Sequence, residues 1–357
     1  AGALRTSDAF VHYGEPTEQR HSPRVVSALI IRPRLQGLKL VAATAYLCAF
    51  AFHRIRPLTD ASSLPDDRVA TFQIDGQPVR GRIVRMGPAI DAVLSAHAYP
   101  APVAELLGEA CALAALIGSA LKFDGRLILQ AQGDGPVRYV VCDYGTDGTL
   151  RGYCRYDEGE LAALTAEDAR PGAHRLLGKG VFVMTLDQGP DFDRHQGITP
   201  IEGDSLALCA EHYFQQSEQI PTEVRLAVGH LTDETGSGWR AGGMMIQRLA
   251  ADATRGETEE AWTRARALFN TISADELIDP QVPSETLLWR LFHEDGVRLE
   301  AAQPLEALCR CSPGRIATVL DSFTDQERAD MVEPDGKIHI TCEYCAKVYA
   351  LDAGTTV

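Results

Sequence analysis

The fold of the middle of the chain can be predicted from residues 125–156, GRLILQAQGDGPVRYVVCDYGTDGTLRGYCRY. It holds three strand-like segments, 125–132, 137–144 and 150–156, which are separated by the short joints GDGP and GTDG. Asp-Gly is a strong hairpin signal, because glycine readily adopts the positive φ of a tight turn. The stretch therefore predicts an antiparallel meander of three strands.

Further strands and helices flank this meander on both sides. Alternating apolar residues predict strands, and apolar residues at helical spacing predict helices. The predicted strands cover 69–74, 79–87, 180–186, 223–231 and 239–249, and the predicted helices cover 100–123 and 203–219, the second capped by Asp204 or Ser205. Because the order shows no βαβ rhythm, the sequence predicts an α+β fold, with an N-terminal mixed α/β core domain over 63–250.

The segment 251–304 has a different character and is predicted to be a metastable helical linker. Residues 252–300 carry eleven acidic and five basic side chains. Two short helices with one apolar face each are predicted, and these faces hold Trp262, Ala265, Leu268, Phe269 and Ile272, then Leu287, Leu288, Leu291 and Phe292. Short helices draw most of their stability from packing. We therefore expect the linker to lie on the core domain, either as a plain helical subdomain or as a segment whose docking can be lost.

The composition is that of an ordinary soluble globular protein. The chain has 357 residues, of which 45% are hydrophobic and 23% charged, and its formal net charge is −15. This acidic balance argues against a nucleic-acid partner and against an anionic membrane. Nine cysteines without framework spacing argue against a secreted disulfide scaffold, and so favour a reducing, cytoplasmic location.

The first 62 residues are predicted to be an extension that is disordered or not part of the functional protein. Between Gln19 and Thr59 there are seven basic residues and no acidic ones, and the apolar run 40–52 has 13 residues. A run of that length is too short to span a bilayer. A signal or transit segment is the alternative, weakened because the run lies far from the start of the sequence.

Four of the nine cysteines stand in two tight pairs near the C-terminus. Cys309 and Cys311 form a C-x-C pair, and Cys342 and Cys345 form a C-x-x-C pair after thirty intervening residues. Soft thiolates at short spacing chelate a tetrahedral ion, and four of them suit Zn²⁺ best. The pattern therefore predicts one zinc ion per chain, with local disulfides or idle thiols as the alternative.

The chain between the two pairs looks folded. Ser312 followed by Pro313 indicates a helix start, and TDQE at 324–327 is a capping-box pattern. An Asp-Gly turn at 335–336 predicts a hairpin that delivers Cys342. Segment 305–357 is therefore predicted to be a small C-terminal four-cysteine zinc domain.

Other candidate sites have plainer explanations. The loop 187–197 gathers Asp187, Asp191, Asp193 and His195 and is a candidate catalytic carboxylate loop, but its glycine and proline content also makes a plain structured turn. Glu211 and His212 do not form an H-E-x-x-H motif, and a capped amphipathic helix explains them better. The scattered cysteines lie among apolar or strand-like neighbours; they are Cys48, Cys111, Cys142, Cys154 and Cys209. The last four are interpreted as small buried hydrophobes. The sequence therefore predicts no enzyme.

Several stretches together resemble the redox-switched holdase chaperones, typified by the thirty-three-kilodalton heat-shock protein of bacteria. They are ALKFDGRLILQAQGDGPV, DQGPDFDRHQGITPIEGDSLALCAEHYFQQSEQIPT and the C-x-C…C-x-x-C tail. The resemblance covers roughly 66–352. Ala346 departs from the glycine or polar residue that often follows such a C-x-x-C pair, and the extension 1–62 has no counterpart.

The resemblance implies an ATP-independent chaperone that is switched by oxidation. It implies that reduced thiolates hold zinc, that disulfides Cys309–Cys311 and Cys342–Cys345 form on oxidation, and that zinc then leaves. The linker would undock, unfolding client proteins would bind, and the active form would be a homodimer. No ATP-binding G-x-x-x-x-G-K-[ST] motif occurs. The alternative is a zinc-ribbon regulatory or nucleic-acid-binding protein, although 301–357 carries nine acidic and five basic residues.

Overall fold

The computed structural model describes residues 53–54, 66–122, 124–189, 192–233, 236–250 and 258–352. The predicted extension 1–62, apart from residues 53–54, lies outside the described residues, as do Cys48 and Asp191. Residues 49–357 form one compact unit, and it is this unit whose described part is discussed below.

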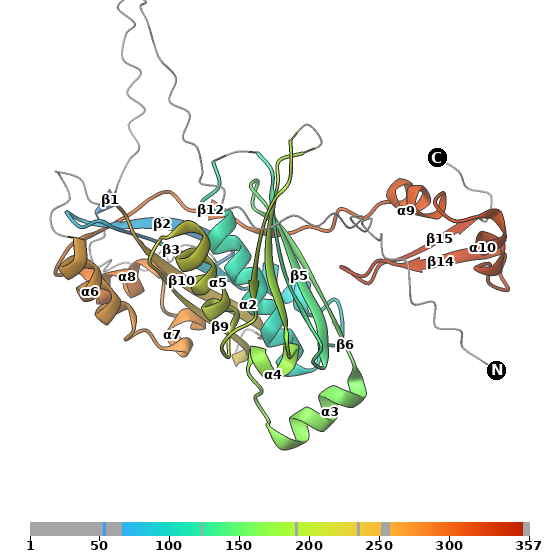
Figure 1. Cartoon of the computed structure of the whole chain (residues 1–357), viewed down its shortest axis with the longest axis horizontal. Helices are drawn as coiled ribbons and strands as arrows, with labels where there is room; N and C mark the ends of the chain where they lie inside the picture. The colour runs from blue at the N-terminus through green and yellow to red at the C-terminus, as the bar shows by residue number, and fades with distance from the viewer. Residues whose placement is uncertain are drawn as a thin grey trace, which may run out of the picture. The chain divides into compact units, whose positions relative to one another are not determined.

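One sheet of this unit, sheet A, is seven-stranded and antiparallel (Figure 1). Its order is β1 (His53–Arg54), β11 (Val297–Leu299), β2 (Arg68–Ile74), β3 (Val79–Met86), β10 (Gly236–Arg248) and β9 (Thr222–Asp233), and β12 (Gln303–Pro304) also pairs with β2. The four predicted strands 69–74, 79–87, 223–231 and 239–249 are thereby confirmed. Two strands from the predicted linker, β11 and β12, were not anticipated, because segments of two or three residues carry no alternation.

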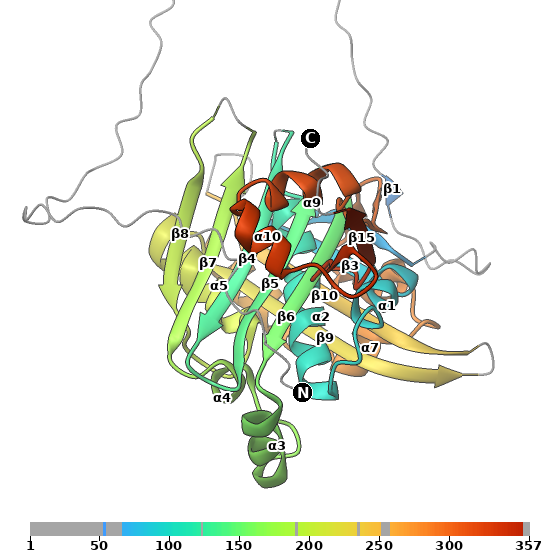
Figure 2. The same ribbon diagram turned by 90° about the vertical axis from the view of Figure 1, so that its right-hand side faces the viewer.

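The second sheet, sheet B, contains the predicted meander (Figure 2). Its order is β13 (Glu306–Ala307), β6 (Thr149–Tyr156), β5 (Val137–Gly145), β4 (Arg126–Gly133), β7 (Gly180–Asp187) and β8 (His195–Pro200). The Asp-Gly joint works as expected, since Gly148 has φ +92° and a Cβ there would clash with the carbonyl oxygen of Pro304. The last residues of the predicted loop 187–197 belong to strand β8 in the structure.

Helix α2 (Ala101–Gly118) packs between the two sheets and is the centre of the larger core. Its faces are buried almost all round, because it contacts strands of both sheets. In the described part of the chain, α2 is the one helix long and apolar enough to cross a membrane, but 78% of it is buried inside the protein. Its apolar sequence is that of a core helix.

The remaining core helices are short. The predicted helix 203–219 is α5 (Leu206–Tyr213) followed by a π-helical turn η1 (Phe214–Glu218), and the Ser205 side chain caps α5 by accepting from the Leu208 amide. Three core helices were not anticipated, namely α1 (Pro88–Leu94), α3 (Glu158–Glu167) and α4 (Ala173–Leu177). In the linker, where two helices were predicted, α7 (Ala274–Ile278) was also not anticipated. Helix α3 buries only Leu161 and therefore shows little apolar periodicity.

The linker docks on sheet A, as expected. It forms α6 (Thr258–Phe269), α7 (Ala274–Ile278) and α8 (Ser284–Phe292). Their apolar faces join a second core cluster with Phe72, Ile83 and Met244 of the sheet. Of the nine face residues predicted from the sequence, eight are buried and Leu268 is partly buried.

The C-terminal segment forms α9 (Pro313–Leu320), α10 (Asp325–Asp330), β14 (Lys337–Thr341) and β15 (Val348–Asp352). The Ser312 cap and the Thr324–Glu327 capping box are both present. The hairpin prediction was wrong in one respect. The Asp335–Gly336 turn precedes β14, and the hairpin β14–β15 turns instead at residues 342–347, so that the second cysteine pair is the hairpin turn itself.

Candidate metal centre

The four cysteine sulfurs meet at one point. All four Sγ atoms lie within 4.8 Å of one another. The two closest contacts that are recorded run between the pairs, with Cys309 Sγ to Cys342 Sγ at 3.7 Å and Cys311 Sγ to Cys345 Sγ at 3.4 Å. A zinc tetrahedron with bonds of about 2.3 Å has sulfur–sulfur edges of about 3.8 Å. The spacing fits metal ligation and is too long for a disulfide of about 2.05 Å.

Local backbone structure presents each pair to the other. The first pair lies between strand β13 and the Ser312 cap of α9, and the second pair forms the tight turn between β14 and β15. In that turn the Cys342 amide donates to the Lys347 carbonyl (2.9 Å), and the Ala346 amide donates to the Cys342 carbonyl (2.8 Å). These bonds close the turn around the two thiols.

The turn places Ala346 at φ +56°, a conformation that favours glycine. An L-residue there costs roughly 1–2 kcal/mol, partly offset because alanine restricts the unfolded chain more than glycine does. Ala346→Gly should therefore bind zinc about two- to fivefold more tightly, corresponding to about 0.5–1 kcal/mol. A competition titration against a chromogenic chelator measures this change. Ala350→Gly in strand β15 is the control, and equal or weaker zinc binding by Ala346→Gly would contradict the assigned strain.

The four thiols differ in how readily they ionise. Burial opposes ionisation of Cys311, but hydrogen bonds from Tyr349 and the other cysteines outweigh it and lower its pKa to about 7. Burial raises the pKa of Cys342 and raises that of Cys345 to about 12. Four thiolates this close repel one another unless a cation lies between them. The Tyr349 hydroxyl, which donates to Cys311 Sγ (3.1 Å), is the kind of outer hydrogen bond that orients a metal ligand.

The scattered cysteines differ from these four in their burial and in the pKa of their thiols. Cys111, Cys142, Cys154 and Cys209 are all buried in the core. Burial raises the thiol pKa of Cys154 and of Cys209, and a hydrogen bond with Cys111 together with burial raises the pKa of Cys142. Since oxidants must reach a thiol to react with it, these four buried thiols should be inert.

Replacing Cys111, Cys142, Cys154 and Cys209 together with alanine should leave the metal content and the response to oxidant unchanged. The measurement compares zinc stoichiometry and peroxide-induced zinc release in the variant and the parent protein. Circular dichroism shows whether the variant is folded. A folded variant that no longer responds to oxidant would place the reactive thiols in the core.

The structure separates the residues of the candidate carboxylate loop. Asp187 is 4% exposed and pairs with Arg126 (2.8 Å) and Arg194 (3.5 Å), whereas Asp193 and His195 are exposed. Glu211 is also structural, because its Oε1 accepts from the Val224 amide (2.7 Å) at the start of β9. These contacts stabilise the fold.

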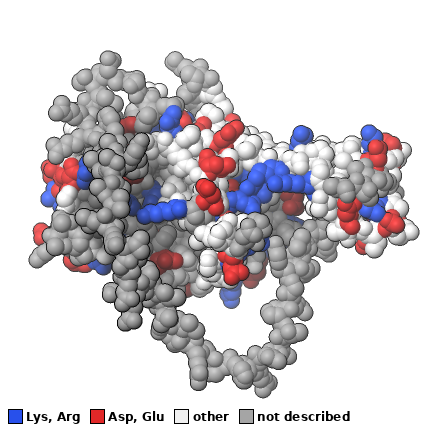
Figure 3. Space-filling view, turned by 90° about the horizontal axis from the view of Figure 1, so that it is seen from above, with Lys and Arg blue, Asp and Glu red and all other residues white. Residues whose placement is uncertain are grey.

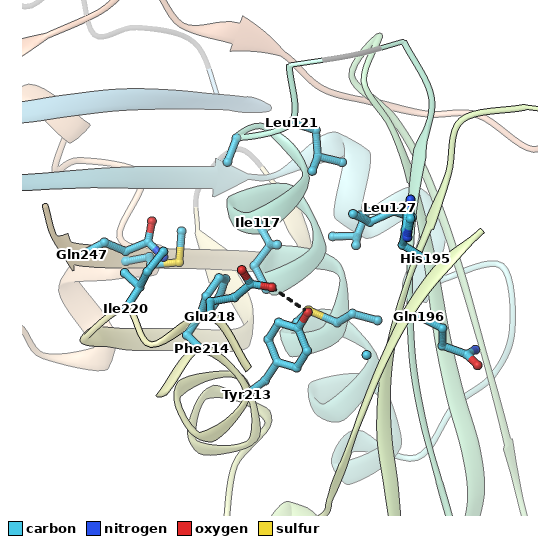
Figure 4. Close-up of a pocket in the computed structure, with 15 residues that line it drawn as sticks. Ile117, Leu121, Leu127, His195, Gln196, Tyr213, Phe214, Glu218, Ile220 and Gln247 are labelled. Carbon is cyan, nitrogen blue, oxygen red and sulfur yellow. Dashed lines mark hydrogen bonds between the residues drawn. The ribbon is translucent and has the colours of Figure 1, made fainter. Parts of the chain in front are cut away.

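A pocket of about 600 Å³ lies at the C-terminal end of α2 (Figure 4). Strands β7 and β8 form one side of it, and the α5–η1 segment forms the other. Its walls are mainly apolar, with Met184 and Met245 among them, and the Tyr213 hydroxyl donates to Glu218 (3.1 Å) at its edge. No serine, threonine or cysteine is among the described residues that line it. We assign it no chemical role.

Among the described residues visible in Figure 3, a compact basic group lies next to acidic side chains. A nucleic-acid interface would need a basic surface that follows the phosphate backbone.

Fold and site together define an α+β core protein that carries a C-terminal four-cysteine cluster of metal-binding geometry. The chain matches the family model described as "Hsp33 protein" over residues 67–352. It belongs to the Hsp33 family.

Named relatives agree with this assignment. The chain is 67% identical over 287 residues to a 33 kDa chaperonin of Caulobacter vibrioides, covering 80% of this chain and 95% of the relative. It is 39% identical over 291 residues to a 33 kDa chaperonin of Pseudomonas aeruginosa, covering 80% and 92%. The crystal structure of the 33 kDa chaperonin from Thermotoga maritima has the same fold, with a TM-score of 0.66, 23% identity, and coverage of 80% of this chain and 95% of that one. Family membership supports a chaperone function for this chain.

Proposed function

We propose that the protein is a redox-regulated, ATP-independent holdase chaperone. In its reduced state Cys309, Cys311, Cys342 and Cys345 hold one Zn²⁺ and the chaperone is inactive. The observation that carries the proposal is the convergence of these four sulfurs within 4.8 Å in a chain of the Hsp33 family. The ion would supply a fold-stabilising crosslink, which is worth about 10–16 kcal/mol in small zinc domains.

In the reduced, zinc-bound state the linker would stay docked on sheet A. Its helices cover apolar side chains of sheet A, including Phe72, Ile83 and Met244. Helix α7 approaches so closely that a Cβ on Gly242 of β10 would clash with the Leu277 carbonyl oxygen. The linker therefore hides a contiguous apolar surface of the kind that soluble proteins rarely expose.

Polar contacts also hold the linker. Arg85 of β3 donates to the carbonyl oxygens of Asp279 and Val282, and Arg240 of β10 donates to that of Ile278 (2.7 Å). Asp66 pairs with both arginines. A buried guanidinium is costly unless it is paired. When the linker leaves, water replaces these partners, so the contacts favour the docked state without making undocking prohibitive.

Oxidation would release the switch by a balanced two-electron step at each pair. The two thiolates of a pair lose two electrons to one peroxide-class oxidant, the S–S bond forms, and the O–O bond breaks to give water and an alcohol or a second water as two protons are taken up. The proposed bonds are Cys309–Cys311 and Cys342–Cys345. Disulfide sulfur is a poor zinc ligand compared with thiolate, so the ion leaves and the small module loses its main stabilisation.

The exposed linker and sheet A surface would then bind unfolding client proteins. We also propose that the active form is a homodimer, as the family resemblance implies. The cysteine usage supports the further proposal that the protein works in the cytoplasm. Catalysis has no part in this account, because holding a client requires only an exposed apolar surface.

A light-scattering assay of a heat-denatured client tests the proposal. Reduced protein should leave aggregation unchanged, whereas peroxide-treated protein at a near-stoichiometric ratio should suppress it without ATP. Protection by the reduced and oxidised forms to the same extent would rule out redox regulation, and protection by neither form would rule out the holdase.

A further inference from the structure

The first cysteine pair is tied to the core by backbone pairing. Strand β13 runs parallel to β6, and the Leu308 amide donates to the Leu150 carbonyl (3.0 Å). Cys309 follows directly in the chain and is thereby held beside β6, the strand that carries Arg151. The position of the thiol pair against sheet B is therefore fixed by the preceding residues.

A buried carboxylate lies where Arg310, the residue between the two thiols, reaches sheet B. Asp143 of β5 is 3% exposed, and its Oδ2 accepts from Arg310 and from Arg151 (3.0 Å), with Arg126 at 3.7 Å. Its Oδ1 is buried and has no hydrogen-bond partner among the described residues. A buried carboxylate needs such charged partners, and Arg310 is the one that comes from the cysteine module.

The second cysteine pair touches the same face of the sheet through its own intervening residues. The Arg151 guanidinium lies over the Tyr344 ring, with its Cζ 4.0 Å from the ring centre. The ring centres of Tyr344 and Tyr153 are 6.4 Å apart. The neighbouring Glu343 carbonyl is 2.8 Å from His97 Nε2. Arg151 thus contacts Tyr344, between the cysteines of the second pair, and it also binds Asp143, which in turn binds Arg310 between the cysteines of the first pair.

We propose that Asp143 and Arg151 form a docking seat on sheet B for the four-cysteine module, and that this seat slows the release of the metal. The inference rests on the proposed zinc site and adds the core domain as a part of the switch. Both pairs must keep their present backbone paths for Arg310 and Tyr344 to reach the seat. Opening the metal cage moves these residues, so the docked arrangement resists opening. Charge-assisted bonds of this kind are stronger than neutral ones.

Arg310→Met removes the charge on the module side, and Asp143 keeps its contacts with Arg151 and Arg126. In reduced protein challenged with a chromogenic chelator, we expect zinc transfer to be about tenfold faster than in the parent, in keeping with loss of a charged hydrogen bond. Amide exchange at residues 306–308 should also speed up. The matched control is Arg138→Met, which removes an arginine from the same strand as Asp143 where it pairs with exposed Glu160 (2.7 Å).

Asp143→Asn tests the other side of the contact and should give a similar acceleration. If the two residues act through each other, the double variant Asp143→Asn/Arg310→Met should release zinc no faster than the faster single variant. Release and exchange at parent rates in folded Arg310→Met protein would overturn the seat. If the parent protein contained no zinc, the proposed function would be overturned. In that case the rate of amide exchange at residues 306–308, compared between the parent and Arg310→Met, would still show whether Arg310 docks the module.

Discussion

Phe269→Asp protein, kept fully reduced, should suppress aggregation of a heat-denatured client to nearly the extent of oxidised parent protein. Phe269 is fully buried at the end of α6, where it packs in the cluster between the linker and sheet A. Truncating such a side chain costs about 3–5 kcal/mol, and a buried unpaired carboxylate costs more. The short linker helices cannot absorb that loss, because they depend on packing for their stability. Light scattering of the client measures the result.

The matched control is Ala267→Asp, which adds the same charge two residues away on an exposed position of α6. It should behave as the parent. Leu288→Asp, fully buried on α8, should repeat the effect of Phe269→Asp. If proteolysis shows that the linker is open in either reduced variant and the client still aggregates, linker exposure is not the activating step.

A subtler pair of variants tests the same contact without adding a charge. Gly242→Ala should loosen α7 and lower the oxidant dose needed for activation, because its Cβ would clash with the Leu277 carbonyl oxygen. Gly314→Ala, where no atom lies within 4 Å of the added Cβ, should leave the dose unchanged. The measurement is the peroxide concentration for half-maximal protection. An unchanged midpoint for Gly242→Ala would show that α7 has room to move.

Cys342→Ser should abolish zinc binding and unfold the C-terminal module. Reduced parent protein should contain one zinc per chain, whereas the variant should contain about none, since loss of one thiolate removes a ligand from a site that contributes about 10–16 kcal/mol. Cys342 is also the most buried of the four cysteines. Metal analysis and amide exchange over 309–352 measure the two effects.

Cys209→Ala, in the core helix α5, is the matched control and should keep its zinc. A parent stoichiometry near zero, or equal zinc contents in Cys342→Ser and parent, would contradict the four-thiolate site.

Much of the fold and of the cysteine cluster could be predicted from the sequence, because the sequence patterns that specify them are local. The Asp-Gly joints of 125–156 predicted the meander, and Ser312 with Pro313 predicted the start of α9. The spacing of the two cysteine pairs predicted the cluster, since short loops leave paired thiols few other arrangements.

What the sequence did not show depends on contacts between distant segments. Strand β13 has two residues and is strand-like only because β6 lies beside it. The burial of Asp143 under Arg310 joins positions 167 residues apart. The hairpin turn was misplaced because two turn signals, Asp335–Gly336 and the cysteine pair itself, flank β14, and only the pairing with β15 selects between them.

We propose that metal release and chaperone activation are one event, and a single time course of both can test this. Reduced protein is treated with peroxide in the presence of a chromogenic chelator, and samples are transferred to a client aggregation assay. We expect protection to appear with, or shortly after, the release of one zinc per chain, and to return to zero when the protein is reduced and zinc is restored. Full protection before zinc is released, or complete release with no protection at any later time, would contradict the account.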